Sequence, residues 1–315
     1  MVYAVIMLTA GVPGNILTIV AYCKCEHLQS PTNLLICNQS IGDLFTCITG
    51  PLFVILNYTQ AGLVLTSSHR YLCLICLASL LISLESSIFN ILALSTERFI
   101  AVYIPYHYYS WVTVTRTKRV VISIWSVVVI TNCLPIMGWE NWTPGVPCMT
   151  IYVYPKIFFQ FVFVIPCLVC LGACAIENVL IAIMAVKKQR SIAPALPVNH
   201  DQLQEEAARK IKRQFKVTKM LLMVVGVFYI TWVPYLVLNS ILYSMPTSWK
   251  DRGVPEWVVI LNELCKPLVV VNTITNPFIY GYKNQTFRDA YYKVLGIRNT
   301  QIEAEQLPST ARTSD

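Results

Sequence analysis

Charged residues are scarce in this sequence. Asp, Glu, Lys and Arg make up 13% of its 315 residues, and 56% of the residues are hydrophobic, whereas soluble domains carry about 25% charged residues. The sequence also has no phosphate-binding glycine loop, no Cys/His set at metal-ligand spacing, no nucleophile–base pair and no internal repeat. The shortage of charge excludes an ordinary soluble domain, and the missing motifs give no support to a membrane enzyme.

Long apolar stretches take the place of charge. About 20 apolar residues cross a hydrocarbon core of about 30 Å, and seven stretches reach that length. They are 2–23, 31–58, 72–102, 120–139, 157–186, 220–243 and 256–282. The sequence therefore predicts an all-α membrane protein in which residues 1–282 form one bundle of seven transmembrane helices.

Polar segments separate and follow these stretches. The charged end of the third inner loop, 187–209, favours helix and is expected to extend the sixth helix. In 283–296, apolar residues recur at i, i+4, i+7 and i+8, which predicts an amphipathic helix at the membrane surface. The polar residues 297–315 are expected to form a disordered cytoplasmic tail.

Basic residues set the predicted orientation, because Lys and Arg accumulate in loops on the cytoplasmic side. If the first residue lies outside, most of the 24 Lys and Arg residues fall inside. The N-terminus is therefore expected to be extracellular and the C-terminus cytoplasmic, in a multi-pass protein of the plasma membrane. The same bias accounts for the net charge of +8 without a nucleic-acid partner.

Among the carboxylates in the apolar stretches, Asp43 and Glu85 require a role, because a charge within the membrane costs at least about 2.5–3.5 kcal/mol. Asp43 either hydrogen-bonds its neighbours or holds a small cation, for which sodium is the hypothesis. Other helices supply polar candidates for that network, namely Asn15, Ser87, Asn272 and Asn276. Glu85 contacts a ligand, pairs with another helix, or is merely tolerated. In a seven-helix transporter or channel, the alternative interpretation, both carboxylates would lie on an ion path, although transporters commonly show internal repeats.

Most of the twelve cysteines lie inside apolar stretches, where a free thiol behaves as a small buried hydrophobe. Cys73 and Cys148 both lie on the predicted outer side, which is oxidising, so they could form a bridge that ties the second outer loop over the mouth of the bundle. Asn141, in Asn-Trp-Thr, is a glycosylation acceptor in that loop, and Asn57, in Asn-Tyr-Thr, is a weaker candidate near the membrane.

Short motifs, one per predicted helix, carry a family resemblance. They run in order as "GNILTIV" with Asn15, "NLLICNQSIGDL" with Asp43, "STERFIAVY" with Glu97 and Arg98, Trp125, Pro166, "FYITWVPY" with Trp232 and Pro234, and "NTITNPFIY". This set resembles the rhodopsin-like (class A) G-protein-coupled receptors over all seven stretches. The resemblance implies a receptor, not an enzyme, that binds an extracellular small-molecule ligand within the bundle and activates a heterotrimeric G protein.

The resemblance also assigns roles to individual residues. It implies a Cys73–Cys148 disulfide and an allosteric sodium pocket of Asp43, Ser87, Asn272 and Asn276. The implied G-protein switch comprises Glu97, Arg98, Asn276, Pro277 and Tyr280, with Glu97 restraining Arg98 at rest. The implied activation core comprises Ile88, Pro166 and Phe228, and Trp232 would form the floor of the ligand pocket.

Two departures from the family pattern touch this switch. Cys174 stands where most members have a Tyr that stabilises the active state, and Gln214 stands where many have an acid that pairs with the arginine. The resting restraint would then depend on Glu97 alone. We therefore expect raised basal signalling.

Within the family, "IPYHYYSWVTVTR" and the later "GW" are similar to adenosine receptors, and Asn239 matches the position where those receptors hold adenine. Other nucleoside-gripping positions differ, at Leu84, Thr150, Ile151, Leu236, Val269 and Val270. Leu80 stands where receptors for biogenic amines have an acid. The pocket suits a largely apolar or small ligand, and its expected contacts are Leu81, Leu84, Glu85, Phe158, Trp232, Leu236, Asn239 and Val270.

Overall fold

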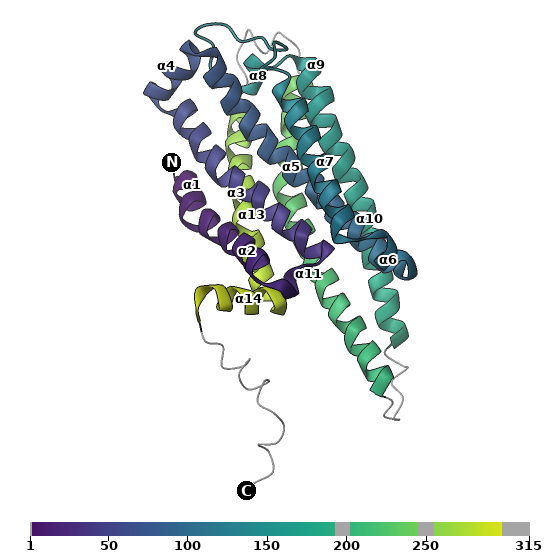
Figure 1. The fold of residues 1–315 in the computed structure, drawn as a ribbon. Helices are drawn as coiled ribbons and strands as arrows, with labels where there is room; N and C mark the ends of the chain where they lie inside the picture. The colour runs from purple at the N-terminus through teal and green to yellow at the C-terminus, as the bar shows by residue number, and fades with distance from the viewer. Residues whose placement is uncertain (1, 193–201, 245–254, 298–315) are drawn as a thin grey trace.

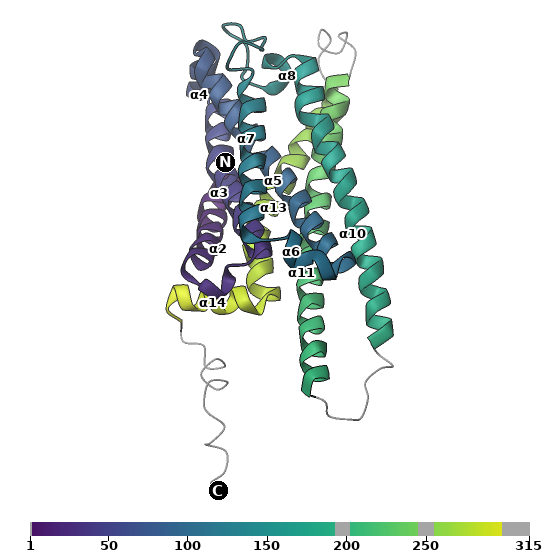
Figure 2. The same cartoon turned by 45° about the vertical axis from the view of Figure 1, so that its right-hand side comes forward.

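The structure is a computed structural model that describes residues 2–192, 202–244 and 255–297. In these ranges the chain forms helices and no strand, and the long helices run alongside one another as a bundle (Figures 1 and 2). Seven helical positions follow in order: α1 (Val2–Ile6) with η1 (Met7–Gly11) and α2 (Val12–Lys24), α3 (Pro31–Tyr58), α5 (Arg70–Tyr103), α7 (Val114–Cys133), α9 (Lys156–Phe158) with η3 (Phe159–Val164) and α10 (Ile165–Ile192), α11 (Gln202–Ser244), and α13 (Glu256–Lys283). The predicted all-α membrane bundle is confirmed.

Five of these seven positions are occupied by helices that are long and apolar enough to cross a membrane. Within the described residues, the helices long and apolar enough to cross a membrane are Val2–Lys24, Pro31–Tyr58, Arg70–Tyr103, Lys156–Lys187 and Lys216–Ser244. α5 is the most buried of the five, and it packs against α3, α7 and α10. α7 falls short of this test because Arg116, Lys118 and Arg119 lie in its first two turns.

α7 is displaced by six residues from the predicted fourth stretch, 120–139, at both ends. At its start the Thr113 hydroxyl accepts a hydrogen bond of 3.3 Å from the backbone N of Arg116 and caps the helix. At its end the helix stops before Pro135, because a proline lacks the N–H and its ring clashes with the carbonyl four residues earlier. The apolar character of the sequence continues beyond this point, but the helix does not.

Two prolines in the spanning helices follow π-helical turns. η1 ends at Gly11, two residues before Pro13, and η3 ends at Val164, two residues before Pro166. The wider π turn gives room for a proline ring that would clash with a regular α-helical turn. The helical path therefore continues through both prolines.

Short helices occupy four of the connections, and the sequence analysis did not predict them. They are η2 (Glu26–Leu28), α4 (Gln60–Ser68), α6 (Pro105–Trp111) and α8 (Thr150–Val153). α4 and α8 lie at one end of the bundle (Figure 1). Gly62 allows α4 to fold back onto α3, since a Cβ there would lie 2.5 Å from the carbonyl oxygen of Ile55.

α14 (Gln285–Leu295) crosses the opposite end of the bundle (Figure 1). Its buried face packs on α2, where the Tyr291 hydroxyl lies 2.7 Å from Thr18 Oγ1. At this end α10 and α11 project beyond the other helices (Figure 2), and α11 begins at Gln202, as expected for an extension of the sixth helix. Residues 193–201 of the third inner loop and all of the expected tail after Ile297 lie outside the described residues.

Candidate functional site

Glu97 and Arg98 lie near the end of α5 and are buried against two other elements. The two side chains form a salt bridge. Arg98 Nη2 also donates to Thr32 Oγ1 on α3 at 2.6 Å and to the Tyr108 hydroxyl on α6 at 3.2 Å. Thr32 donates in turn to Glu97 Oε1 at 3.0 Å, and Tyr108 donates to the same oxygen. We call these four residues the Arg98 cluster.

Local helix starts bring Thr32 and Tyr108 to α5. Ser30 caps α3 by accepting from Asn33 N at 3.3 Å, and Pro31 and Pro105 provide the first turns of α3 and α6. Burial, and then the nearby Glu97 carboxylate, raise the pKa of the Tyr108 phenol. Tyr108 therefore remains a neutral hydrogen-bond donor at physiological pH.

The Arg98 cluster holds a buried guanidinium through three side chains. A buried charge pair is retained when its remaining lone pairs and protons are satisfied, which Thr32 and Tyr108 achieve here. The expectation that Glu97 alone restrains Arg98 is thereby corrected. Sequence reasoning missed Thr32 and Tyr108 because neither belongs to the motif that contains Arg98. The three residues lie on three separate helices, and no regular sequence spacing relates them.

Cys174 takes part in a polar contact between α10 and α5. Its Sγ lies 3.1 Å from Ser95 Oγ, and Asn178 Nδ2 donates to the same hydroxyl at 2.8 Å. Thr96, which follows Ser95 on α5, donates to Glu177 on α10 at 2.8 Å. These bonds tie α10 to α5 next to Glu97. The Gln214 side chain lies outside the described part of the structure.

Asp43 is buried midway along α3. Gln39 Nε2 and Asn276 Nδ2 donate to its two oxygens at 3.3 and 2.7 Å, and the Ser87 hydroxyl also interacts with the carboxylate. Both amide atoms of Asn272 and the Oδ1 of Asn276 are buried with no hydrogen-bond partner among the described residues. Buried polar atoms are normally paired with protein, water or an ion. A carboxylate beside unpaired oxygens is a donor set that fits a small hard cation.

A chain of amides connects this carboxylate to α7. Trp125 Nε1 donates to Asn38 at 2.9 Å, Asn38 donates to Asn90 at 2.7 Å, and Asn90 donates to Gln39 at 2.8 Å. Gln39 then donates to Asp43. Sequence reasoning named Asp43 and Trp125 and missed the amides between them, although "NQ" in the second stretch and Asn90 in the third were visible as polar residues in apolar surroundings.

Pro277 and Tyr280, the remaining residues expected in the switch, lie in the last turns of α13. The Tyr280 ring packs 5.8 Å, centroid to centroid, from the Phe287 ring on α14, and its buried hydroxyl has no hydrogen-bond partner among the described residues. Asn15, expected in the polar network, donates instead to the Thr273 carbonyl at 3.1 Å. These contacts hold α13 against α2 and α14.

Most of the expected ligand contacts and two activation-core residues belong to one buried cluster: Leu81, Leu84, Phe158, Trp232, Leu236, Ile88 and Phe228. Trp232 stacks on Phe228 with ring centroids 5.5 Å apart. Pro166 is half-buried near the start of α10. Val270 lies in a different cluster with Met7 and Cys47, so the structure does not bring it together with Trp232.

The two polar residues expected in the pocket are engaged with helices. Glu85 is 2% exposed, and its carboxylate accepts a hydrogen bond from Nδ2 of Asn132 on α7. Of the three alternatives for Glu85, this geometry is that of pairing with another helix. Asn239 Nδ2 donates to the Tyr235 carbonyl of its own helix at 2.7 Å, and this bond leaves the second N–H of the amide and its Oδ1 for a ligand.

Further aromatic rings belong to the same buried cluster as Trp232. Phe158 makes edge contacts with Trp139 and Tyr154 at centroid distances of 5.4 and 5.2 Å. Phe159 stacks on Tyr243 of α11 at 4.0 Å. Edge-to-face and stacked pairs stabilise such layers beyond the area that they bury. The outer ends of η3 and α11 are therefore joined through aromatic side chains.

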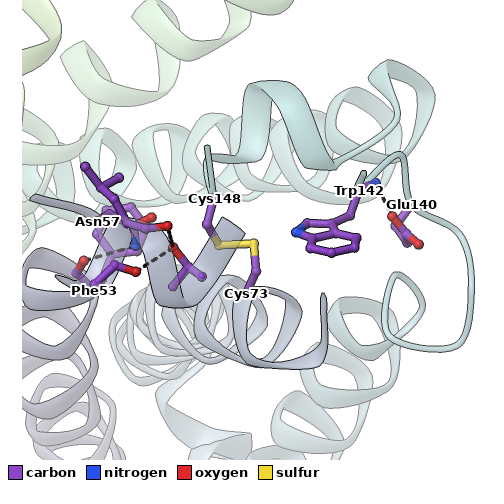
Figure 3. Close-up of a disulfide and its surroundings, with 9 residues drawn as sticks. Phe53, Asn57, Cys73, Glu140, Trp142 and Cys148 are labelled. Carbon is purple, nitrogen blue, oxygen red and sulfur yellow. Dashed lines mark hydrogen bonds between the residues drawn. A yellow bond between two sulfur atoms is a disulfide. The ribbon is translucent and has the colours of Figure 1, made fainter. Parts of the chain in front are cut away.

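A disulfide and an ion pair fix the second outer loop at this end. Cys73 and Cys148 are bonded, with Cα atoms 5.6 Å apart, so the predicted bridge is confirmed (Figure 3). Arg70 at the start of α5 pairs with Glu140 at 2.9 Å. Glu140 also accepts a hydrogen bond from the backbone N of Trp142, and both residues are drawn in Figure 3. The loop is thus anchored to α5 at two points.

The two glycosylation candidates differ in accessibility. Asn141 is exposed in the outer loop. Asn57 is 3% exposed, and its Nδ2 donates to the Phe53 carbonyl at 3.1 Å. A glycosyl acceptor amide must reach an enzyme from the surface. The structure therefore argues against Asn57 as an acceptor and is compatible with Asn141.

Comparison with known proteins identifies the family. A sequence model described as "7 transmembrane receptor (rhodopsin family)" matches residues 14–280. The chain is 27% identical to adenosine receptor A2b of Rattus norvegicus over 306 residues, which cover 90% of this chain and 86% of the relative. It is 26% identical to adenosine receptor A2a of Homo sapiens over 320 residues, with 96% and 72% covered. These matches do not favour the transporter or channel interpretation. The chain belongs to the rhodopsin family of seven-transmembrane receptors, and it is a multi-pass G-protein-coupled receptor of the plasma membrane rather than an enzyme.

Proposed function

We propose that the Arg98 cluster is the switch by which this receptor activates its heterotrimeric G protein. With the N-terminus extracellular, as the basic residues predict, the cluster lies at the cytoplasmic end of the bundle. At rest, Glu97, Thr32 and Tyr108 hold Arg98. An agonist bound near the opposite end releases the guanidinium, which then binds the G protein and promotes nucleotide exchange. The observation that carries this proposal is the closed set of hydrogen bonds around Arg98.

The proposed ligand site is the region around Trp232. The Trp232–Phe228 stack connects this region to the activation core, so a ligand that displaces Trp232 also moves Phe228. The described walls are apolar, with Leu81, Leu84 and Leu236 in the same cluster. A buried polar group of the ligand without a partner costs about 1–3 kcal/mol. The proposed ligand is therefore small or largely apolar.

A nucleoside remains the first specific ligand to test, because the relatives are adenosine receptors. Asn239 would hold a purine-like base through its Oδ1 and the N–H that is not bonded to the Tyr235 carbonyl. A screen of nucleosides, amines and lipids in cells that report both cAMP and calcium identifies the class. If Asn239 holds a base, Asn239→Ala abolishes the nucleoside response and spares any lipid response.

The proposal includes a sodium ion at Asp43 in the resting state. Asp43, Ser87, Asn272 and Asn276 would hold it. The bound cation would supply a positive charge that compensates the buried carboxylate. The support is the set of buried oxygen atoms that have no hydrogen-bond partner among the described residues.

Guanine-nucleotide exchange in membranes tests the switch directly. GTP binding by G proteins is measured with the wild-type receptor, with Arg98→Ala, and with Lys293→Ala as a control that removes an exposed charge from α14. The proposal expects exchange to be lost in Arg98→Ala and retained in Lys293→Ala at equal surface expression. Exchange that persists in Arg98→Ala would show that Arg98 is not the contact that drives it.

A further inference from the structure

A cavity whose wall does not include Trp232 opens between α5 and α7 near α6. Its volume is about 430 Å³, which falls within the range of roughly 300–1,000 Å³ for small-molecule sites. The apolar wall includes Phe89, Ala93, Ile100, Trp111, Val120 and Ile124. Trp111 and Val120 are exposed on the outer surface of the bundle. This surface faces lipid in a membrane-spanning receptor, so the cavity is reached from the bilayer.

The polar groups in the wall of this cavity are already engaged. Thr96 donates to Glu177 at 2.8 Å, and Thr117 donates to the Thr113 carbonyl at 3.0 Å. Glu97 belongs to the Arg98 cluster, where it is paired with Arg98. An occupant therefore meets walls whose hydrogen-bonding groups have partners within the protein. Such walls favour an alkyl chain over a polar molecule.

Arg116 is the exception in this wall. Its Nη1 donates to the carbonyls of Ser110 and Trp111 at 2.7 and 3.1 Å, at the end of α6. A guanidinium has five N–H donors, so Nε and Nη2 remain for another acceptor. Neither ion pair among the described residues involves Arg116, and the exposed Lys118 and Arg119 lie close to it in the chain. The cavity thus joins an apolar wall to a charged mouth.

We propose that this cavity is a second ligand site that binds a long-chain fatty acid, with the alkyl chain between α5 and α7 and the carboxylate on Arg116. Arg116 is the one charged lining residue that retains free N–H donors, and a fatty acid has one carboxylate to accept them. An Arg–carboxylate contact is strong and directional because the guanidinium presents parallel donors. Glu97 lines the same cavity, so the bound chain lies beside the Arg98 cluster.

The test uses the full-length receptor in phosphatidylcholine nanodiscs. Palmitic acid that carries a diazirine near its methyl end is added, irradiated, and its attachment sites are mapped by mass spectrometry. We expect saturable labelling on α5 and α7 that palmitate displaces and palmityl alcohol displaces poorly. Ala93→Phe and Ile124→Trp fill the cavity, and Arg116→Gln removes the charge. Each is expected to weaken binding about tenfold or more.

Matched controls separate the cavity from the general membrane surface. Ile122→Trp makes the same exchange as Ile124→Trp on the lipid-facing side of α7, and Lys118→Gln removes a neighbouring charge outside the cavity wall. Both should bind within about twofold of wild type. Thermal unfolding shows whether Ala93→Phe and Ile124→Trp are folded. Only a folded variant is used in the binding comparison.

Three results would overturn the proposal. One is labelling that Arg116→Gln and a folded filling variant leave unchanged. Another is attachment only at residues that do not line the cavity. The third is displacement by phosphatidylserine at the same mole fraction as effectively as by palmitate, which would assign the cavity to a phospholipid chain.

Discussion

Thr32 on α3 donates a hydrogen bond of 3.0 Å to Glu97 on α5. The same hydroxyl accepts from Arg98 at 2.6 Å. A single neutral group therefore contacts both members of the charge pair whose separation is the proposed activating step. The resting restraint belongs to three elements of the fold, since Tyr108 on α6 contributes in the same way.

Replacing Thr32 tests this distribution of the restraint. Thr32→Val keeps the shape of the side chain and removes its bonds to Glu97 and Arg98. Because hydrogen bonds to charged groups contribute about 1.5–3 kcal/mol, we expect basal nucleotide exchange to rise about fivefold or more. Exchange is measured without agonist at equal surface expression. Thr115→Val, an exposed threonine on α7, serves as the control. Unchanged basal exchange in Thr32→Val would contradict the role of this hydroxyl.

Restoring an acid on α11 should tighten the same restraint. Gln214 stands where the family pattern has an acid that pairs with the arginine, so Gln214→Glu is expected to lower basal exchange. Gln214→Ala is the control, because it alters the position without adding charge. The wild type is expected to show raised basal signalling compared with a receptor that has the acid. Low basal exchange at matched expression, unaffected by Gln214→Glu, counts against this prediction.

The sodium site predicts a dependence on the cation. Replacing sodium by N-methylglucamine at constant ionic strength should raise basal exchange in the wild type, because the resting state loses its bound ion. Asp43→Asn should remove this difference, since the carboxylate is the charged ligand. Asp289→Asn on α14 should retain it. A sodium effect of equal size in Asp43→Asn would place the ion elsewhere.

The Glu85–Asn132 contact predicts a stability effect that differs between the two partners. Asn132→Ala leaves a buried carboxylate without its donor, which should lower the free energy of unfolding by about 1–3 kcal/mol. Glu85→Gln keeps an acceptor oxygen and should change it less. Thermal unfolding in nanodiscs measures both variants. If Glu85→Gln instead weakens agonist binding at unchanged stability, Glu85 contacts the ligand.

Glycosylation provides a simple test of surface placement. Asn141→Gln should remove the electrophoretic shift that peptide N-glycosidase produces, because Asn141 is exposed in the outer loop. Asn57→Gln should leave the shift intact, since Asn57 is buried and bonded to Phe53. Loss of a glycan in Asn57→Gln would mean that this end of α3 opens during synthesis.

Helix positions were predictable where they depend on local properties of the chain. The second helix, Pro31–Tyr58, has the predicted bounds, because Pro31 supplies a helix start and a predominantly apolar stretch follows. The fourth helix does not have the predicted bounds, because hydropathy continues past Pro135 while the helix ends at Cys133, where Pro135 offers no N–H to extend the hydrogen bonding. Hydropathy reports transfer into lipid, and backbone hydrogen bonding decides where a helix ends.

The candidate site divides in the same way. Asp43 and Arg98 were recognisable because each is a rare charge in an apolar stretch and each lies in a family motif. Thr32 and Tyr108, the neutral partners of Arg98, were not recognisable from the sequence. Asn132, the partner of Glu85, was not recognisable either. Neutral donors of this kind are common along the chain, and none has a spacing that singles it out.

By itself the sequence determined that this chain spans a membrane seven times and belongs to the rhodopsin family, because the thickness of the bilayer and the order of short motifs are both read along one dimension. Only the tertiary structure decided that Thr32 and Tyr108 accept hydrogen bonds from Arg98, that Glu85 pairs with Asn132, and that Asn57 is buried. Each of these depends on which helix faces which, and that is fixed by side-chain packing between segments far apart in the sequence.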